Sequence, residues 1–187
     1  MRVFVAINSS EGERARLAAA TSPLRQAGYP IRWVPTENIH LTLKFLGEVP
    51  DERVPEVSSA VDAAAAGIGP FDMTLQGAGA FPSPRRPNVV WVGIKANEQL
   101  AGLQAKIEAA LESIGFPRED RRFSPHLTIG RAKRKGARPP EFQGLEDALA
   151  RLSYEDTFRV SAVDVMMSHL MPGGAVYEVA HGSRLEP

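Results

Sequence analysis

The sequence His-Leu-Thr-Leu at residues 40–43 occurs again as His-Leu-Thr-Ile at residues 126–129. In each copy polar and apolar side chains alternate within an apolar, β-branched run, which is the pattern of a half-buried strand. Successive side chains of a strand point to opposite faces, so the histidine and the threonine of each copy share one face. The repeat therefore predicts two strands that bury their aliphatic side chains in a core and present four polar ones: His40, Thr42, His126 and Thr128.

The two histidines are 86 residues apart (126 − 40), and the same offset carries Val3 onto Val89. Each of these valines begins an apolar run, at 3–7 and at 89–94, that indicates a buried strand. Each half then follows the same expected order of strand, helix, turn, motif strand, helix and strand. That order is common among α+β proteins and by itself is weak evidence of a duplication. The evidence is stronger here because the order coincides with the repeated motif. We therefore expect a duplicated unit with an approximate two-fold axis, which brings the two motif strands together across a central cleft.

Cap and turn signals locate the other elements. Ser10 and Glu13 have the form of a capping box, and Pro23 is expected to end or kink the helix that follows. Asp51 and Asn97 are suitable caps for helices that run to about residue 66 and to residue 114. Residues 77–87, rich in glycine and proline, indicate a connection near the boundary between the halves. Further strands are expected at 31–34 and 71–77, a short helix at 145–152, and a β-hairpin formed by 158–167 and 175–181.

Composition narrows the classes of protein. The chain of 187 residues has 22 Lys and Arg against 22 Asp and Glu, which argues against a protein that coats nucleic acid or an anionic membrane. It has no cysteine, which excludes disulfides, thiolate zinc sites and a cysteine nucleophile. No apolar run approaches the roughly 20 residues that cross a bilayer, and the run at 1–7 is too short for a signal peptide. We expect a cytoplasmic protein with no membrane partner, and a monomer.

Other catalytic classes lack their motifs. The chain has neither the Gly-x-Ser-x-Gly of serine hydrolases nor the glycine-rich phosphate loop of P-loop nucleotidases. A zinc site needs three or four convergent ligands, and His169 and His181 show no such spacing. We expect these two histidines on the surface or in the hairpin, and we expect no metal site.

The flanks of the motifs carry a resemblance. The first motif is preceded by Glu-Asn-Ile at 37–39 and followed by Lys-Phe-Leu-Gly at 44–47. The second motif is preceded by Ser-Pro at 124–125 and followed by Gly-Arg at 130–131. In addition, Arg-Pro at 86–87 precedes the strand expected at 89–92. With these flanks the chain resembles, over nearly its whole length, the 2H phosphoesterase superfamily. Within it, the resemblance is to the RNA 2′,3′-cyclic phosphodiesterases, the LigT-like proteins also called 2′-5′ RNA ligases.

The resemblance implies a bilobal α+β fold. Residues 1–187 would form one domain, with lobes of approximately 1–85 and 86–187, antiparallel or mixed sheets around a central cleft, and helices on the outside. It also implies a site in the groove between the lobes, no metal and no other cofactor, and RNA termini or nucleotides with a 2′,3′-cyclic phosphate as partners.

Two facing imidazoles suit the opening of a cyclic phosphate, because one can take a proton from water while the other protonates the leaving ribose oxygen. The threonine hydroxyls can donate to the non-bridging phosphate oxygens. Spacing leaves open which histidine is the acid; the resemblance implies that His40 is the proton donor and His126 the acceptor. It also implies that Arg131 contacts substrate. Strict alternation would turn Arg131 away from His126, so this role requires a bulge or a strand end, which Gly130 permits.

The favoured hypothesis is metal-independent hydrolysis of RNA 2′,3′-cyclic phosphate ends to 2′-phosphates, with 2′-5′ ligation when a ribose hydroxyl replaces water. One alternative is a sister enzyme that acts on small cyclic nucleotides or on ADP-ribose cyclic phosphate. Another is a module that binds RNA or nucleotides without turnover.

Two further features bear on substrate binding. Residues 118–138 contain eight Lys and Arg against one Glu and one Asp, a patch that would attract an RNA terminus or would equally serve as a solvated loop. Trp33, Phe45 and Phe81 could stack on a base, but aromatic side chains are more often buried, so we expect all three in the core.

Overall fold

The computed structural model describes residues 1–133, 139–172 and 174–187. Its four α-helices are α1 (Glu11–Gln26), α2 (Val54–Ala65), α3 (Glu98–Ser113) and α4 (Leu145–Ala150), with short 3₁₀ turns η1 (Thr36–Asn38), η2 (Asp51–Arg53) and η3 (Pro139–Phe142). Its strands are β1 (Arg2–Asn8), β2 (Ile31–Trp33), β3 (His40–Glu48), β4 (Phe71–Phe81), β5 (Val89–Ile94), β6 (His126–Ala132), β7 (Glu155–Val160), β8 (Ala162–Met171) and β9 (Gly174–Arg184).

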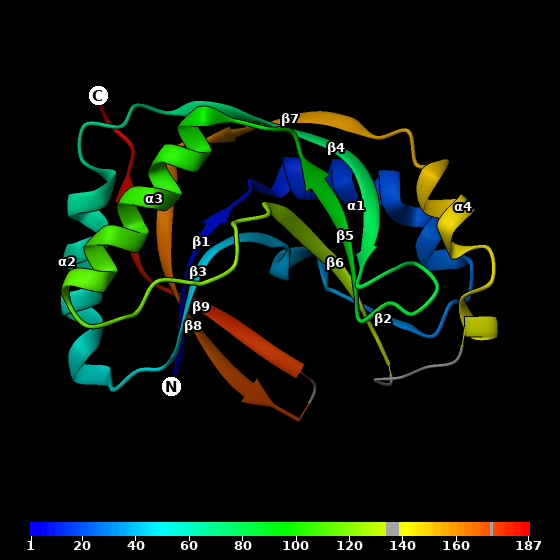
Figure 1. The fold of residues 1–187 in the computed structure, drawn as a ribbon, viewed down its shortest axis with the longest axis horizontal. Coiled ribbons are helices and arrows are strands. Elements are labelled where there is room, and N and C mark those ends of the chain that lie inside the picture. Colours follow the sequence, from blue (N-terminus) through cyan, green and yellow to red (C-terminus); the bar gives the residue numbers. More distant parts are fainter. Residues whose placement is uncertain (134–138, 173) are drawn as a thin grey trace.

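The strands form one continuous sheet in the order β7-β4-β5-β6-β3-β1-β8-β9, with β2 paired to β6. Every pairing is antiparallel. The sheet is curled, with β3 and β6 near its middle and the helices on its outside: α2 and α3 at the left of Figure 1, α1 and α4 at the right. The predicted α+β fold with outer helices is confirmed.

The first helix of each half packs against strands of the other half. In α1, Arg16 forms an ion pair with Asp156 of β7 at 2.7 Å, and Glu13 accepts a hydrogen bond from the Arg159 backbone. In α3, Glu108 binds Lys44 of β3. The two halves of the chain are therefore held together by helices as well as by the shared sheet.

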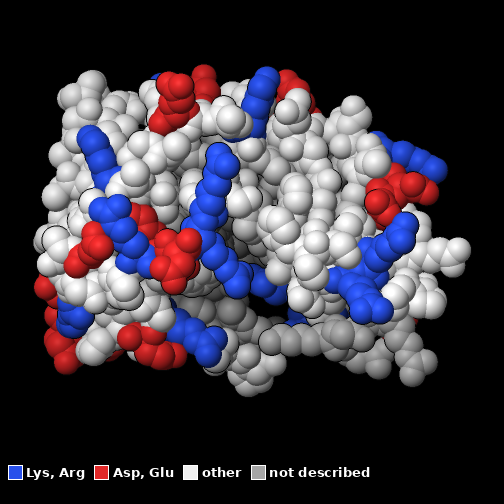
Figure 2. All heavy atoms as spheres, viewed as in Figure 1, with Lys and Arg blue, Asp and Glu red and all other residues white. Residues whose placement is uncertain are grey.

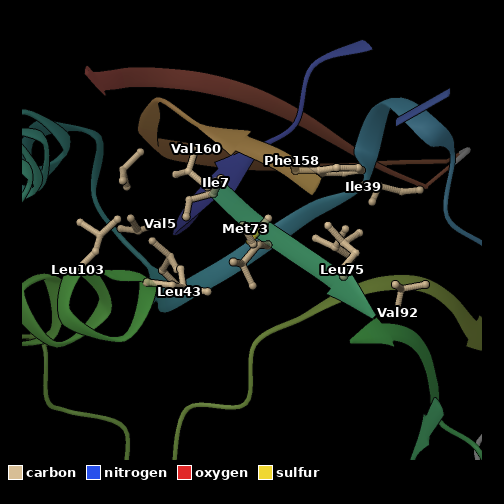
Figure 3. Packing of buried hydrophobic residues seen from close by; sticks show 14 of the residues in the cluster. Val5, Ile7, Ile39, Leu43, Met73, Leu75, Val92, Leu103, Phe158 and Val160 are labelled. Carbon is tan, nitrogen blue, oxygen red and sulfur yellow. The ribbon is translucent and has the colours of Figure 1, made fainter. Parts of the chain in front are cut away.

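The aliphatic side chains of both motifs lie in the core, as predicted: Leu41 and Leu43 are 1% and 3% exposed, and Leu127 and Ile129 are fully buried. They belong to one cluster that spans the sheet and the helices. Figure 3 shows side chains from distant parts of the chain meeting there, among them Val5, Ile7, Leu43, Met73, Leu75, Val92 and Phe158. Burial of these faces leaves the opposite, concave face of the sheet free to carry polar groups.

Several predicted boundaries are corrected. The capping box of Ser10 and Glu13 is present, but α1 continues through Pro23 to Gln26. Asp51 lies in η2 and makes no side-chain cap, so α2 begins only at Val54. The strand predicted at 158–167 is two strands separated at Ser161: β7 pairs with β4, whereas β8 lies beside β1 and forms the hairpin with β9.

The predicted end of a strand at Gly77 is also wrong, because β4 extends to Phe81. The extension pairs with β5, with Gly79 opposite Trp91. A Cβ at position 79 would lie 2.4 Å from the indole ring, so glycine is what allows this ring to lie across the strand. The close packing explains why a glycine-rich stretch remains a strand here.

Among the described residues, no helix is both long enough and apolar enough to span a membrane.

Candidate active site

The two motif strands lie side by side. β3 and β6 are antiparallel neighbours joined through the pair Leu41 and Leu127. In such a ladder the next residues on either side also face each other, which sets His40 opposite Thr128 and Thr42 opposite His126. Because the two leucines are buried in the core, the four polar side chains lie on the other face. The structure thus brings together the four residues that the repeat singled out.

Both imidazoles are held in the same way. Nδ1 of His40 lies 2.8 Å from the carbonyl oxygen of Asn38, and Nδ1 of His126 lies 2.7 Å from that of Ser124. A carbonyl oxygen only accepts, so Nδ1 carries the hydrogen in each ring. Nε2 is then the nitrogen of each ring that can exchange a proton with a ligand.

Aromatic rings surround each histidine. The His40 ring lies 4.9 Å from that of Phe4 and 5.2 Å, edge-on, from that of Tyr177. The His126 ring lies 5.2 Å from that of Phe81, also edge-on. Such packing limits rotation of the imidazoles.

The pKa of His40 lies below the usual 6.5. Burial is the main cause, because it disfavours the charged form, and the positive charge of Arg131 acts in the same direction. The hydrogen bond to the Asn38 carbonyl opposes them by favouring the protonated ring. His40 is therefore a stronger acid than a free histidine.

Arg131 reaches this face through a bulge. Thr128 pairs with Trp91 and Gly130 with Val90, which leaves Ile129 as an extra residue in β6. In β5, Val89 and Trp91 are two residues apart and therefore lie on the same face of the strand. Val89 pairs with Arg131, and Trp91 pairs with Thr128. The bulge that a substrate contact by Arg131 requires is thus present, and Arg131 lies on the same face as Thr128.

β3 has a bulge at the equivalent place, where Leu43 is skipped between the pairs Thr42–Ala6 and Lys44–Val5. Phe45 follows His40 by five residues, just as Arg131 follows His126 by five. The bulge turns Phe45 to the site face, where it is 61% exposed. Phe81 is 38% exposed. The prediction that these two rings are buried in the core is wrong; Trp33 does pack against the core.

The bulge in β3 also buries a charge that sequence reasoning missed. Lys44 is 1% exposed at its side chain, and its Nζ donates to Glu108 Oε2 at 2.5 Å and to the Pro117 carbonyl at 2.7 Å. Strict alternation along β3 places Lys44 on the solvent side, so the strand pattern does not predict its burial. The helix pattern of α3 could have indicated a buried charge, because Glu108 adjoins the apolar positions Ile107 and Leu111.

Positive charge is available at this face. Figure 2 shows a hollow near the centre of the view, bordered by Lys and Arg side chains, where β3, β6 and the β8–β9 hairpin lie in Figure 1. Within the predicted basic stretch, Arg118 is paired with Glu112 at 2.6 Å. Among the described residues, Arg121, Arg122 and Lys133 are exposed and have no ion-pair partner. Arg134, Lys135 and Arg138 lie outside the described residues.

The other two histidines lie on β8 and β9, away from the motif strands. His169 pairs with Glu178 at 3.2 Å and His181 with Asp62 at 2.8 Å. Both side chains are partly exposed, on the hairpin strands as predicted. Within residues 1–133, 139–172 and 174–187, no group of three or more His, Asp or Glu side chains is arranged to hold a metal ion.

Comparison with known proteins bears on the resemblance. The family model of LigT-like phosphoesterases matches the chain twice, over residues 7–91 and 92–177. The chain is 33% identical over 179 residues to the RNA 2′,3′-cyclic phosphodiesterase of Methanothermobacter thermautotrophicus. The aligned region covers 95% of this chain and 95% of the relative. It is 35% identical over 188 residues to the protein of that name from Thermus thermophilus, covering 96% of this chain and 87% of the relative.

Solved structures have the same fold. The crystal structure of TT0787 of Thermus thermophilus matches with a TM-score of 0.80 at 29% identity, over 99% of this chain and 98% of that one. Escherichia coli LigT in complex with 3′-AMP matches in fold with a TM-score of 0.78 at 23% identity, over 100% and 98%. The paired motifs, the family match over both halves and the full-length relatives agree, and the chain belongs to the LigT-like phosphoesterase family of enzymes.

Proposed function

We propose that this protein hydrolyses 2′,3′-cyclic phosphates at RNA ends and leaves a 2′-phosphate. The relatives that are about one-third identical over nearly the whole chain have the name of this activity. The observation that carries the proposal is the matched pair of histidines on adjacent strands, each with Nδ1 bound to a backbone carbonyl two residues earlier. Two imidazoles oriented alike can act as acid and base on one phosphorus atom.

In the proposed reaction, Nε2 of His126 takes a proton from water as the water oxygen bonds to phosphorus. The bond from phosphorus to the ribose 3′-oxygen breaks, and Nε2 of His40 gives that oxygen its proton. A positioned acid or base typically contributes about 10²- to 10⁴-fold to the rate. The carbonyls of Asn38 and Ser124 hold the rings so that no reorientation is needed when the protons move.

The charge that grows on the non-bridging oxygens needs donors. Thr42 and Thr128 are diagonal to each other across the strand pair, each opposite the histidine of the other motif. Their hydroxyls can donate to a phosphate bound between the rings, and the guanidinium of Arg131, on the same face, adds a positive charge. We assign these three residues to substrate binding.

The chemistry requires no metal or other cofactor, because the histidines supply both proton transfers. If a ribose hydroxyl replaces water as the nucleophile, the same step joins two RNA ends through a 2′-5′ linkage.

Turnover of an oligonucleotide with a 2′,3′-cyclic phosphate end, in EDTA, tests the proposal. We expect full activity, a terminal 2′-phosphate identified by chromatography against 2′- and 3′-phosphate standards, and lower activity on the mononucleotide. Loss of activity in EDTA that zinc restores would contradict the metal-free reaction. Preference for the mononucleotide would indicate an enzyme for small cyclic nucleotides, and binding without product would indicate a non-catalytic module.

A further inference from the structure

The carbonyl oxygens that hold the two motif histidines are positioned by different local structures. Ser124 is followed by Pro125, whose ring fixes its own φ and disfavours helical backbone in the residue before it. Asn38 is followed by Ile39 and ends η1, a 3₁₀ turn of three residues. Hydrogen bonds in such a turn have poorer geometry than those of an α-helix. The carbonyl that holds His40 therefore gains more from an additional anchor.

The side chain of Asn38 supplies an anchor from a distant strand. Its Nδ2 donates to the carbonyl oxygen of Ala175 in β9 at 3.3 Å, and this bond is partly buried. The backbone carbonyl oxygen of the same residue lies 2.8 Å from Nδ1 of His40 and accepts its hydrogen. One residue thus links β9 to the imidazole, through its side chain at one end and its main chain at the other.

The part of the β8–β9 hairpin that Asn38 binds extends beyond β1. The pairing of β1 with β8 ends at Ser168, so residues 169–171 and 174–176 pair with each other and not with β1. Figure 1 shows the two strands projecting together from the rest of the sheet. Among the described residues outside the hairpin, Asn38 is the one that donates a hydrogen bond to this projecting end. Loss of that bond would leave the end of the hairpin freer to move.

The same hairpin contacts the imidazole directly. Tyr177 lies two residues after Ala175 in β9, and its ring packs edge-on against the His40 ring at a centroid distance of 5.2 Å. It also packs edge-on against the ring of Phe4 at 5.3 Å. The hairpin therefore acts on His40 in two ways, through the Tyr177 ring and through the amide of Asn38.

We propose that Asn38 is a positioning residue for the general acid: its amide binds the β8–β9 hairpin to η1 and so keeps the Asn38 carbonyl on Nδ1 of His40. Nε2 of His40 then stays turned toward the substrate. This inference rests on the proposed function, since it takes His40 as the proton donor. It concerns the orientation and the tautomer of the ring, which can be measured without substrate.

The charges around His40 are unchanged when Asn38 loses its amide, because asparagine is uncharged. The charged or titratable side chains near this ring are His126 and Arg131 on β6, Tyr177 on β9, and Arg14, Glu37 and Asp164, which line a recess of about 480 Å³ beside it. The bond to the Asn38 carbonyl raises the pKa of His40, because it favours the protonated ring. A weaker bond should therefore lower this pKa further.

The first test follows the imidazole nitrogens by ¹⁵N NMR in the protein without substrate, with signals assigned from His40→Ala and His126→Ala. In the wild-type protein we expect hydrogen on Nδ1 of both neutral rings. In Asn38→Ala the His40 ring should become a mixture of the Nδ1–H and Nε2–H forms, and its pKa should fall. The His126 ring should keep its hydrogen on Nδ1, because Pro125 is still present.

Two results of this measurement would overturn the inference. One is a His40 ring whose tautomer and pKa are the same in Asn38→Ala as in the wild-type protein. The other is the same change in both rings, which would mean a general loosening of the site. Neither result depends on turnover, so the proposed function can fail while this inference stands, and the reverse.

The second test is steady-state kinetics on a cyclic-phosphate oligonucleotide. Asn38→Ala should lower kcat about 10- to 100-fold, the scale expected when a catalytic group is misplaced, while KM changes little. The falling limb of kcat/KM against pH should move to lower pH, since it follows the pKa of His40. A higher KM with kcat and this limb unchanged would mean that Asn38 contacts substrate instead, and would overturn the inference.

Two further variants serve as matched controls. Asn38→Leu keeps nearly the same volume but has no N–H, and it should behave like Asn38→Ala in both tests. Wild-type behaviour of Asn38→Leu would show that shape rather than the hydrogen bond matters, and would overturn the inference. Gln26→Ala removes an amide from an exposed bond to Ser22 at the end of α1 and should leave kcat and the falling limb unchanged. Circular dichroism and thermal unfolding establish that each variant is folded.

Discussion

Leu41 of β3 lies directly opposite Leu127 of β6, and both side chains are buried. This one pair joins the two motif strands at the middle of the sheet. The two histidines and the two threonines are each one residue away from this pair, and their imidazoles and hydroxyls alternate around it. The proposed catalytic arrangement therefore depends on the register of two strands that are 86 residues apart in the chain (126 − 40).

His40→Ala and His126→Ala should each lower kcat about 10²- to 10⁴-fold or more, since each removes one proton transfer. Both side chains project from the concave face, so the melting temperature should change little. The measurement is kcat on a cyclic-phosphate oligonucleotide together with thermal unfolding, with His169→Ala as the control. Unfolding of either variant would favour a structural role for these histidines.

Thr42→Val and Thr128→Val should each reduce kcat about 10²- to 10³-fold, the effect of removing a single donor to the transition state. Valine keeps the branched shape and removes only the hydroxyl. Steady-state kinetics would show whether kcat falls while KM changes little. A rise in KM alone would mean that the hydroxyls hold the substrate equally well before and during the reaction.

The profile of kcat/KM against pH should be bell-shaped. The reaction needs protonated His40, and its pKa is below 6.5, so the rate should already decline as pH rises through values below 6.5. The charge of Arg131 contributes to this lowering. Arg131→Gln should therefore move the falling limb to higher pH while it reduces kcat/KM. A limb that stays in place would show that Arg131 does not act on His40.

Lys44→Met should destabilise the protein by about 3–5 kcal/mol, because it leaves Glu108 buried without its cation. Urea unfolding measures this loss. The double variant Lys44→Met with Glu108→Leu should recover most of the stability, since the buried charges are then both gone. No recovery would mean that the bond from Lys44 to the Pro117 carbonyl is the important contact.

The local pattern of polar and apolar residues is sufficient to predict the two motif strands. The alternation at 40–43 and 126–129 predicted both the strands and the shared face of His40 and Thr42, because side-chain direction in a strand repeats every two residues. The sequence likewise predicts the helix cap at Asn97 and the length of α3, because a capping side chain bonds to the backbone within one turn of its own position. The assignment of proton donor and acceptor, and the division into lobes near residue 85, stay predictions.

Other features exist only in the folded chain. The bulges at Leu43 and Ile129 turn Phe45 and Arg131 to the site face, and they are defined by the partner strands rather than by the bulged residues. Burial of Lys44 and the split between β7 and β8 at Ser161 likewise depend on contacts between distant segments.

The sequence by itself determined that the histidine and the threonine of each motif share a face, because that follows from the geometry of an unbroken stretch of a single strand. Only the tertiary structure decided which faces meet and at what register, because cross-strand pairing and burial are properties of several strands at once.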